Sequence, residues 1–563
     1  MAQLRRRLHN THTSIETESM ELTKLIDGLA DPSAYPFTVH HVELRQTHIS
    51  AVFLTEQFVY KVKKPVDYGF LDFSTLEKRR YYCDEEVRLN RRLAADVYLG
   101  VVPITQVDGQ PRFEGDGEPM EWAVKMRRLP DDATLAHRLA HVDVDSQPVD
   151  AQTMRRLGTR IALFHASAES GPHVDIYGHF DSVAGNAREN FEQSQDQVGN
   201  TVSPAVFARL KSLTEAALER QRALIESRAD RGVARDTHGD LRLDHVYIFP
   251  DRQPPQDLVV IDCVEFSERF RFSDPISDIA FLVMSLNLQG RRDLGRELLE
   301  AYIRAAGEES GMSLAAFYTA YRAVVRAKVE GLKLARAEIA DADRQAALTL
   351  SRGSWLLAVG ELETPQRRPC LLLVAGLPGT GKSTLAREVC KRADLHLIRS
   401  DVVRKELVGA VGEQSAETTS NAAGFGQGSY TAEWNRRTYA ECLHRARQLL
   451  LEGERVVVDA NFRVEADRRD FLDAATQLGV RSGMLVCQAD SEIVRARLAN
   501  RRGDASDADW SVYLRAAESW EAPSARTQAV VQTVDTSGGL AGSVAQAIAA
   551  LQRWELWPPS PER

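Results

Sequence analysis

The chain has 563 residues, more than one hydrophobic core usually supports, so two or more domains are expected. Hydrophobic residues make up 43% and charged residues 27%, the ordinary balance of a soluble globular protein. The formal net charge of −9 argues against a protein that is held on nucleic acid by bulk electrostatics.

Nothing in the sequence suggests a secreted or membrane protein. The six cysteines are scattered without a CxxC pair or metal-ligand spacing, as in a protein with reduced thiols. A basic start at Arg5 to Arg7 is followed by polar residues, where a signal peptide needs an apolar stretch. The most apolar stretch, near residues 279–288, is too short to span a bilayer. We therefore expect a soluble, cytoplasmic protein without a membrane partner.

The first third of the chain predicts a polar arm at residues 1–20 and then a small mixed sheet with one helix. Apolar–polar alternation and helical periodicity locate these elements. The expected strands and helix are Ala51–Leu54, Phe58–Val62, Leu76–Leu93 (helical), Val101–Ile104 and Trp122–Met126. Helical periodicity dominates at 133–235 and 276–358, with two short strands between them at 246–249 and 258–261.

Acidic motifs flank those two short strands. His238-Gly-Asp-Leu-Arg-Leu-Asp-His245 precedes the first strand, and Val260-Ile-Asp262-Cys-Val-Glu-Phe begins within the second. One such aspartate can accept the proton of a phosphate acceptor, while the other binds Mg²⁺. With Asp274-Pro-Ile-Ser-Asp278 further on, residues about 40–350 resemble the aminoglycoside phosphotransferase family, which has a bilobal, protein-kinase-like α+β fold.

The resemblance implies roles for individual residues. Asp240 would be the catalytic base and Asp262 a metal ligand, while Asp278 would stabilise the loop. Lys61 would pair with the nucleotide phosphates and with Glu86, although Lys63 and Glu85 are close rivals for those roles. Met126 would lie where the family's adenine-contacting hinge lies.

One position of this motif departs from the family. His245 stands at the metal position where the family has asparagine, and Mg²⁺ prefers oxygen to imidazole. Asp244 could substitute, one metal could suffice, or the module could bind nucleotide without catalysis.

A polar, proline-bounded stretch, Glu363-Thr-Pro-Gln-Arg-Arg-Pro369, indicates an interdomain linker. We therefore expect a kinase-like domain at 21–360, a linker at 361–369, a P-loop domain at 370–553 and a tail at 554–563. Buried-type strands alternate with helical segments after the linker, which is typical of a parallel sheet.

Gly376-Leu-Pro-Gly-Thr-Gly-Lys-Ser383 matches the P-loop pattern G-x-x-x-x-G-K-[ST], between an apolar strand and a helix. Its backbone N–H groups would wrap the phosphates of ATP, Lys382 would reach the β- and γ-phosphates, and Ser383 would bind Mg²⁺. The expected nucleotide-binding residues are Gly376, Leu377, Pro378, Gly379, Thr380, Gly381, Lys382, Ser383 and Thr384.

Two acidic residues follow strands of this domain. Asp459 ends Arg455-Val-Val-Val and could hold the metal's water shell or orient a nucleophile. Asp401 opens a helix, where a helix cap is the simpler interpretation. Arg497 and Arg501 share a helix face and could close over the nucleotide or form a solvated surface.

Three further motifs accompany the P-loop: Ser400-Asp401 with Arg404, then Val458-Asp459-Ala-Asn-Phe, and then Arg497 and Arg501 before Ser506-Asp507-Ala508. On these motifs residues 368–550 resemble P-loop kinases. That family includes gluconate kinase, polynucleotide 5′-kinase and zeta toxins. The resemblance implies that Asp401 contacts or deprotonates an acceptor hydroxyl, and that Arg497 and Arg501 are lid arginines.

The sequence thus predicts a multidomain α/β protein with two kinase-type modules that use ATP and Mg²⁺ to phosphorylate a small-molecule hydroxyl. One alternative is a nucleotide-sensing regulator whose N-terminal pseudokinase gates the P-loop module. Another is a P-loop kinase that acts on nucleic-acid ends, which the net charge of −9 disfavours.

Overall fold

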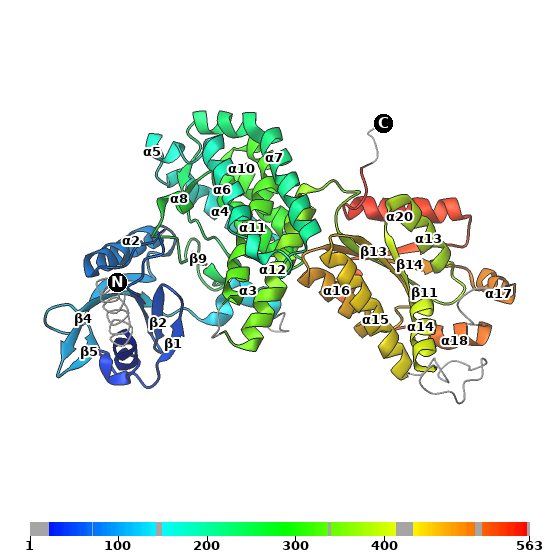
Figure 1. Cartoon of the computed structure of the whole chain (residues 1–563), viewed down its shortest axis with the longest axis horizontal. Helices are drawn as coiled ribbons and strands as arrows, with labels where there is room; N and C mark the ends of the chain where they lie inside the picture. The colour runs from blue at the N-terminus through cyan, green and yellow to red at the C-terminus, as the bar shows by residue number, and fades with distance from the viewer. Residues whose placement is uncertain are drawn as a thin grey trace, which may run out of the picture. The chain divides into compact units, whose positions relative to one another are not determined.

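A computed structural model describes residues 22–69, 71–141, 149–335, 339–412, 432–500 and 509–559. The chain forms two compact units (Figure 1). Unit 1 comprises Met1–His179, Ile225–Leu282 and Arg296–Met312, and unit 2 comprises Phe180–Leu224, Val283–Gly295 and Ser313–Arg563. The predicted arm at 1–20 lies outside the described residues.

Unit 1 begins with a six-stranded antiparallel sheet in the order β1-β2-β3-β6-β4-β5 (Figure 1). Its strands are β1 (Glu43–Gln46), β2 (Ser50–Leu54), β3 (Phe58–Lys63), β4 (Tyr98–Val107), β5 (Gln110–Phe113) and β6 (Glu121–Arg127). The four strands that the sequence predicts are present. Alternation did not reveal β1, because its residues Glu-Leu-Arg-Gln contain one apolar side chain and none of the four is buried.

The period-two alternation of β3 determines which of its side chains can serve a site. Tyr60 and Val62 pack into an apolar cluster with Ile26 and Leu29. Lys61 and Lys63 lie on the opposite face, where α2 (Leu76–Ala94) packs against β4 and β6.

The rest of unit 1 is mainly helical, with two small antiparallel ribbons formed by β8–β9 and β7–β10. Its elements are η2 (Asp131–Ala133), α3 (Leu135–Ala140), α4 (Ala151–Ser167), α5 (Pro172–Asp175), β7 (Arg235–Asp236), η4 (Leu243–His245), β8 (Val246–Ile248), β9 (Leu258–Val260), α8 (Glu268–Arg271) and β10 (Phe272–Ser273). Three helices pass from one unit into the other: α7 (Pro204–Asp230), α9 (Pro275–Leu288) and α10 (Arg292–Ala306). The predicted acidic motifs both lie at the open end of the hairpin β8–β9, where Val246 pairs with Val260.

Unit 2 contains long helices as well as the P-loop domain. These helices include α6 (Phe180–Glu192), α11 (Ala315–Leu334) and α12 (Asp341–Leu362), and α11 packs along α12. Gly353 of α12 approaches the P-loop domain so closely that an added Cβ would lie 2.4 Å from the Gln477 carbonyl oxygen.

The predicted linker at 361–369 is fixed inside unit 2. Arg209 Nε donates to Glu363 Oε2 at 2.8 Å, and Arg368 Nη1 lies 3.0 Å from Glu555 Oε2. The boundary that we expected at 361–369 therefore does not coincide with the division between the two units. The role of 361–369 as an interdomain linker stays a prediction.

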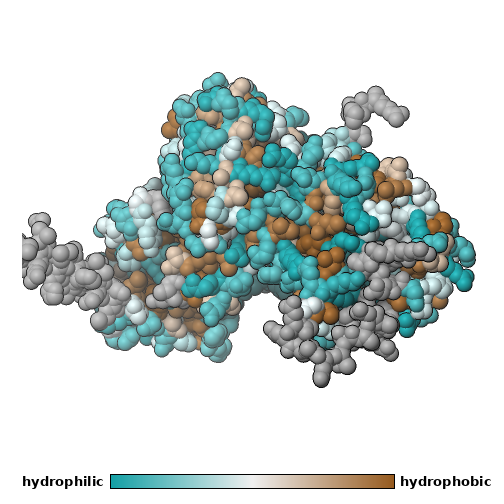
Figure 2. Space-filling model, turned by 45° about the vertical axis from the view of Figure 1, so that its right-hand side comes forward, coloured by the Kyte–Doolittle hydropathy of each residue, from teal (hydrophilic) through white to brown (hydrophobic). Residues whose placement is uncertain are grey.

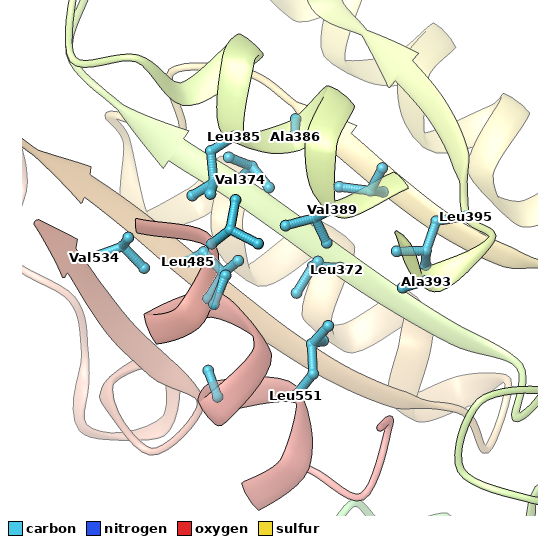
Figure 3. Close-up of a cluster of buried hydrophobic side chains, with 14 of the residues drawn as sticks. Leu372, Val374, Leu385, Ala386, Val389, Ala393, Leu395, Leu485, Val534 and Leu551 are labelled. Atoms are coloured by element: carbon cyan, nitrogen blue, oxygen red, sulfur yellow. The ribbon is translucent and has the colours of Figure 1, made fainter. Parts of the chain in front are cut away.

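The P-loop domain is built on a five-stranded parallel sheet in the order β12-β13-β11-β14-β15. Its elements are β11 (Cys370–Gly376), α13 (Lys382–Ala393), β12 (His396–Arg399), α14 (Ser400–Gly412), α15 (Ala432–Leu451), β13 (Arg455–Asp459), α16 (Glu465–Gln477), β14 (Arg481–Gln488), α17 (Ser491–Ala499), α18 (Trp510–Glu518), α19 (Ala525–Gln528), β15 (Val531–Asp535) and α20 (Leu540–Arg553). On one face, α13 and α20 share an apolar core with Leu372, Val374 and Leu485 (Figure 3). On the other side of the sheet, α15 and α16 pack against its central strands (Figure 1).

The predicted fold class is confirmed: an α+β part with an antiparallel sheet precedes an α/β domain with a parallel sheet. Hydrophilic side chains cover most of the face shown in Figure 2, with apolar patches between them. No helix within the described ranges is both long and apolar enough to cross a membrane.

Candidate active sites

The P-loop joins β11 to α13 and is shaped by three glycines with positive φ. These angles are 143° at Gly376, 80° at Gly379 and 84° at Gly381. An added Cβ would lie 2.7 Å from the Cys487 carbonyl oxygen at Gly376, and 2.9 Å from Leu498 at Gly379. Both conformation and space therefore require glycine, and the backbone is left bare for a ligand.

Hydrogen bonds from the neighbouring strand hold this loop in place. Thr536, just after β15, places Oγ1 2.6 Å from the Thr380 carbonyl oxygen. Thr380 Oγ1 in turn donates to the Leu377 carbonyl at 2.7 Å. The predicted binding residues thus run from the end of β11 at Gly376, through the turn that contains Pro378, to Thr384 in the first turn of α13.

Asp459 stands at the carboxyl end of β13, level with Val374 of β11 and Arg399 of β12. Its side chain is 4% exposed, and within the described part of the chain its Oδ1 has no hydrogen-bond partner. Burial raises the pKa of Asp459, while the charge of Lys382 and a hydrogen bond from Ser383 work against that rise.

This donor set fits Mg²⁺. A buried carboxylate oxygen that no described protein group uses lies beside a serine hydroxyl, and both are the oxygen ligands that Mg²⁺ prefers. Asp459 and Ser383 are the residues that would hold the ion, directly or through its waters.

Asp401 lies in the first turn of α14, directly after β12. Its negative charge acts to raise the pKa of Asp459, so the two carboxylates face the same region. Arg404 Nη1 lies 3.6 Å from Asp401 Oδ1. Since α14 begins at Ser400, Asp401 is a residue of the helix and not the residue before it. Its role towards an acceptor stays a prediction.

Arg497 reaches the P-loop from α17. Its Nη2 donates to the Thr536 carbonyl at 2.7 Å, and its Nη1 has no partner among the residues described. A Cβ on Gly381 would lie 3.6 Å from that Nη1. Arg497 is therefore beside the phosphate-binding loop, whereas Arg501, the other predicted lid arginine, lies outside the described residues.

In unit 1, Lys61 connects β3 with two carboxylates. Its Nζ lies 2.8 Å from Glu86 Oε1 and 2.8 Å from Asp262 Oδ1. Asp262 has a φ of 64°, and its backbone N–H donates to the Tyr98 hydroxyl at 3.1 Å. Burial acts to raise the pKa of Asp262, but the charge of Lys61 and the hydrogen bond that Lys61 donates outweigh it and hold that pKa well below its ordinary value.

The rival residues turn out to have different partners. Lys63 Nζ is fully buried, lies 2.7 Å from Glu86 Oε2 and also contacts Glu265. Glu85 points elsewhere and pairs with Arg88 at 2.7 Å. Glu86 thus receives both lysines, an arrangement that follows from their spacing of two residues on one face of β3.

The loop that carries Asp240 is held by Asp278, a completely buried residue of α9. Its carboxylate accepts from the backbone N–H groups of His238 at 3.1 Å and Gly239 at 2.9 Å. His165 Nε2 lies 3.1 Å from the same carboxylate. Asp278 therefore stabilises the loop, as the sequence predicts, and Asp240 is left partly exposed beside it.

His245 is held by contacts at both of its ring nitrogens. Its Nδ1 donates to the Asp240 carbonyl at 2.9 Å, so Nε2 accepts a hydrogen bond from Arg242 Nη2 at 2.6 Å. This Nε2 is 3.4 Å from Asp262 Oδ2. Asp244, the suggested substitute ligand, is 3.4 Å from Arg242 Nη1. Among the described residues no three acidic, histidine or cysteine side chains form a metal-binding group.

Met126 is the last residue but one of β6 and is 8% exposed. It packs in an apolar cluster with Tyr98, Tyr247 and Val259, so strands of the sheet and of the hairpin β8–β9 share this core. A contact of Met126 with adenine stays a prediction.

Sequence reasoning overlooked several residues that position these sites. Glu265 and Arg242 lie inside motifs that the sequence analysis singled out, and their charge was the available signal. Tyr98 and Thr536 carry no local signal, because each contacts its site through a hydrogen bond with a residue that is distant in sequence.

Comparison with known proteins places the chain among relatives of similar length. A family described as "AAA domain" matches residues 371–523. The uncharacterized protein Rv2004c of Mycobacterium tuberculosis is 33% identical over 486 residues, which cover 86% of this chain and 90% of that protein. Mb2027c of Mycobacterium bovis matches with the same identity and coverage. The C-terminal part of the chain is thus a P-loop domain.

Solved structures with some similarity include a gluconokinase from Sinorhizobium meliloti 1021, with 18% identity and a TM-score of 0.25 over 33% of this chain and 92% of that one. A choline/ethanolamine kinase family protein from Mesorhizobium loti matches with 12% identity and a TM-score of 0.37 over 62% of this chain and 96% of that one.

Proposed function

The chain belongs to the family of the mycobacterial proteins Rv2004c and Mb2027c, and we propose that it is an ATP-dependent phosphotransferase. In this proposal the P-loop domain transfers the γ-phosphoryl group of ATP, with Mg²⁺, to a hydroxyl of a small molecule. Unit 1 provides a second nucleotide site around Lys61, Asp240 and Asp262.

The observation that carries the proposal is the buried Oδ1 of Asp459. A carboxylate that is 4% exposed and has one oxygen without a partner in the described part of the chain is costly to bury unless a ligand uses that oxygen. It lies next to Lys382 and Ser383, whose positions in the P-loop suit phosphate and metal. A function in nucleotide binding alone would explain the P-loop. Phosphoryl transfer also gives a role to Asp401, which adds a second carboxylate at the same edge of the sheet.

The chemistry follows from this arrangement. The acceptor oxygen forms a bond to the γ-phosphorus, and the bond between that phosphorus and the β–γ bridging oxygen breaks, which releases ADP. Asp401 accepts the hydroxyl proton. Lys382 and the unpartnered Nη1 of Arg497 face the charge that develops on the transferred group. Asp459 and Ser383 would hold Mg²⁺, which would supply positive charge against the repulsion between the phosphates.

A second candidate function applies to unit 1. The Arg242–His245 contact occupies the region where a kinase of this type uses an asparagine, which favours nucleotide binding over rapid turnover there. Unit 1 would then sense nucleotide and regulate the P-loop domain.

The test is a search for the acceptor with the full-length protein. A polar metabolite extract and short oligonucleotides are incubated with ATP and Mg²⁺, and mass spectrometry identifies compounds that gain a phosphoryl group. We expect a phosphorylated small molecule that Lys382→Ala no longer produces. Lys391→Ala, an exposed residue of the same helix, serves as the control and should retain the product.

Three outcomes would decide against this proposal. Phosphorylation of oligonucleotide ends alone would assign a different acceptor class. If no compound gains a phosphoryl group, the nucleotide-sensing function would be the candidate that remains. A product that Lys382→Ala still makes at the normal rate would remove the P-loop domain from the reaction.

A further inference from the structure

Arg242 occupies the region between the two candidate catalytic aspartates of unit 1. Its Nε lies 3.1 Å from Asp240 Oδ2, and its Nη2 donates to His245 Nε2 at 2.6 Å. His245 Nε2 in turn lies 3.4 Å from Asp262 Oδ2. A continuous row of side chains therefore connects the base, the guanidinium, the imidazole and the predicted metal ligand.

A two-metal phosphotransfer site needs oxygen ligands at two positions. In protein kinases these come from an aspartate and from an asparagine of the catalytic loop. Here the second residue is His245, whose Nε2 already accepts a hydrogen bond, and Asp262 Oδ1 already contacts Lys61. One oxygen, Asp262 Oδ2, remains beside the imidazole. These residues do not fit a pair of Mg²⁺ ions.

We propose that the guanidinium of Arg242, oriented by His245, takes the place of the second metal ion and binds a phosphate oxygen of a nucleoside triphosphate in unit 1. The site then takes one divalent cation, on Asp262, for each nucleotide. This inference rests on the proposed nucleotide site of unit 1 and specifies how that site neutralises the phosphate charge.

The anchoring of Arg242 distinguishes it from a surface arginine. The side chain of His245 is 7% exposed, and its Nδ1–H is fixed by the Asp240 carbonyl. The side chain of Arg242 is 22% exposed, so it is fixed at one end and still reachable by a ligand. An exposed arginine–aspartate pair would contribute little and would lack this support.

Charge supports the same assignment. Three carboxylates face Arg242 or its histidine partner, namely Asp240, Asp244 and Asp262. Lys61 also contacts Asp262. A triphosphate that enters this region needs cationic contacts that are not already buried. Guanidinium suits this task because it offers several N–H donors in a plane.

The experiment counts metal ions per nucleotide in the full-length chain. Lys382→Ala with Ser383→Ala first weakens the P-loop site, while unit 1 keeps its natural sequence. Bound Mn²⁺ is measured by electron paramagnetic resonance, and the bound non-hydrolysable ATP analogue is measured by equilibrium dialysis. We expect one Mn²⁺ for each bound nucleotide. Two Mn²⁺ per nucleotide, or none, would overturn the inference.

Replacement of Arg242 tests the residue itself. In the same background Arg242→Gln should weaken binding of the analogue by roughly 10-fold, because a charge-assisted hydrogen bond to phosphate is lost. Arg231→Gln, an exposed arginine of the same unit, should leave the affinity unchanged. Equal affinities of the Arg242→Gln and Arg231→Gln proteins would overturn the inference, whereas absence of nucleotide binding before Arg242 is changed would instead refute the proposed nucleotide site of unit 1.

Discussion

The ammonium group of Lys61 lies 2.8 Å from Oε1 of Glu86, a carboxylate that is completely buried and whose other oxygen receives Lys63 at 2.7 Å. One carboxylate thus holds two lysines of the same strand. It fixes Lys61 in a position where it also meets Asp262. The orientation of the predicted phosphate-binding lysine therefore depends on Glu86.

We predict that Glu86→Gln destabilises unit 1 by about 3 kcal/mol, since it leaves buried cations without one of their partners. Glu85→Gln, the adjacent residue that pairs with Arg88, should change the free energy of unfolding by no more than about 0.5 kcal/mol. Urea denaturation of the full-length variants measures both values. Equal effects would contradict the assignment of Glu86 as the shared partner.

Asp401→Asn should reduce phosphoryl transfer by about 10²- to 10⁴-fold while ATP binding stays unchanged, because a base contributes to the reaction and not to nucleotide affinity. Calorimetric ATP binding and turnover of the identified acceptor separate the two effects. Asp394→Asn is the control, since it lies after α13 with a φ of 49°, which asparagine tolerates. A parallel loss of binding in Asp401→Asn would show that Asp401 supports the nucleotide site.

Gly353→Ala should lower the stability of unit 2 by about 2 kcal/mol, because the new Cβ would lie 2.4 Å from a backbone oxygen of the P-loop domain. Gly360→Ala in the same helix meets nothing within 4 Å and should stabilise by about 0.5 kcal/mol. Thermal unfolding compares the two variants. If both stabilise equally, then α12 does not pack closely on the P-loop domain.

The stability of unit 1 should fall with decreasing pH because of His238. Burial lowers the pKa of His238 to about 4, and its ring donates to the Ile261 carbonyl. Between the unfolded pKa near 6.5 and a folded pKa near 4, the unfolded chain binds more protons. This contribution to stability is therefore complete above about pH 6.5 and is lost as the pH falls towards 4, by about 3 kcal/mol at most.

Urea denaturation at pH 7 and pH 5 measures that loss. His238→Gln should show a smaller decrease between the two pH values than the natural protein. His173→Gln removes an exposed imidazole and should leave the decrease unchanged. An identical pH dependence in all three proteins would exclude His238 as its source.

The sequence predicted those parts of the molecule that are determined locally. The P-loop needs consecutive glycines between a strand and a helix, and Gly376 to Ser383 shows this directly. Asp459 was recognisable because a polar residue ends an apolar strand. The division into units was not predictable, because Gly353 resembles any helical glycine until its distant neighbour Gln477 is known.

The choice among neighbouring charged residues also required the structure. The sequence alone does not distinguish Lys61 from Lys63, or Glu85 from Glu86. The way in which β3 and α2 face each other decides which partner each side chain has. The motif around Asp240 suggested a metal site, but the contact between Arg242 and His245 depends on the local turn η4. Local patterns therefore identified the chemistry, and tertiary packing decided which side chains take part.

The most direct test of the account is phosphoryl transfer by full-length protein that carries both Lys382→Ala and Asp240→Ala. Transfer of ³²P from γ-labelled ATP to the identified acceptor is followed in this protein, in each single variant and in the natural protein. The account predicts that Lys382→Ala removes the transfer attributed to the P-loop domain, and that the double variant transfers no label while its circular dichroism is unchanged. Label transfer at the natural rate by Lys382→Ala or by the double variant would contradict the assignment of the reaction to the P-loop domain.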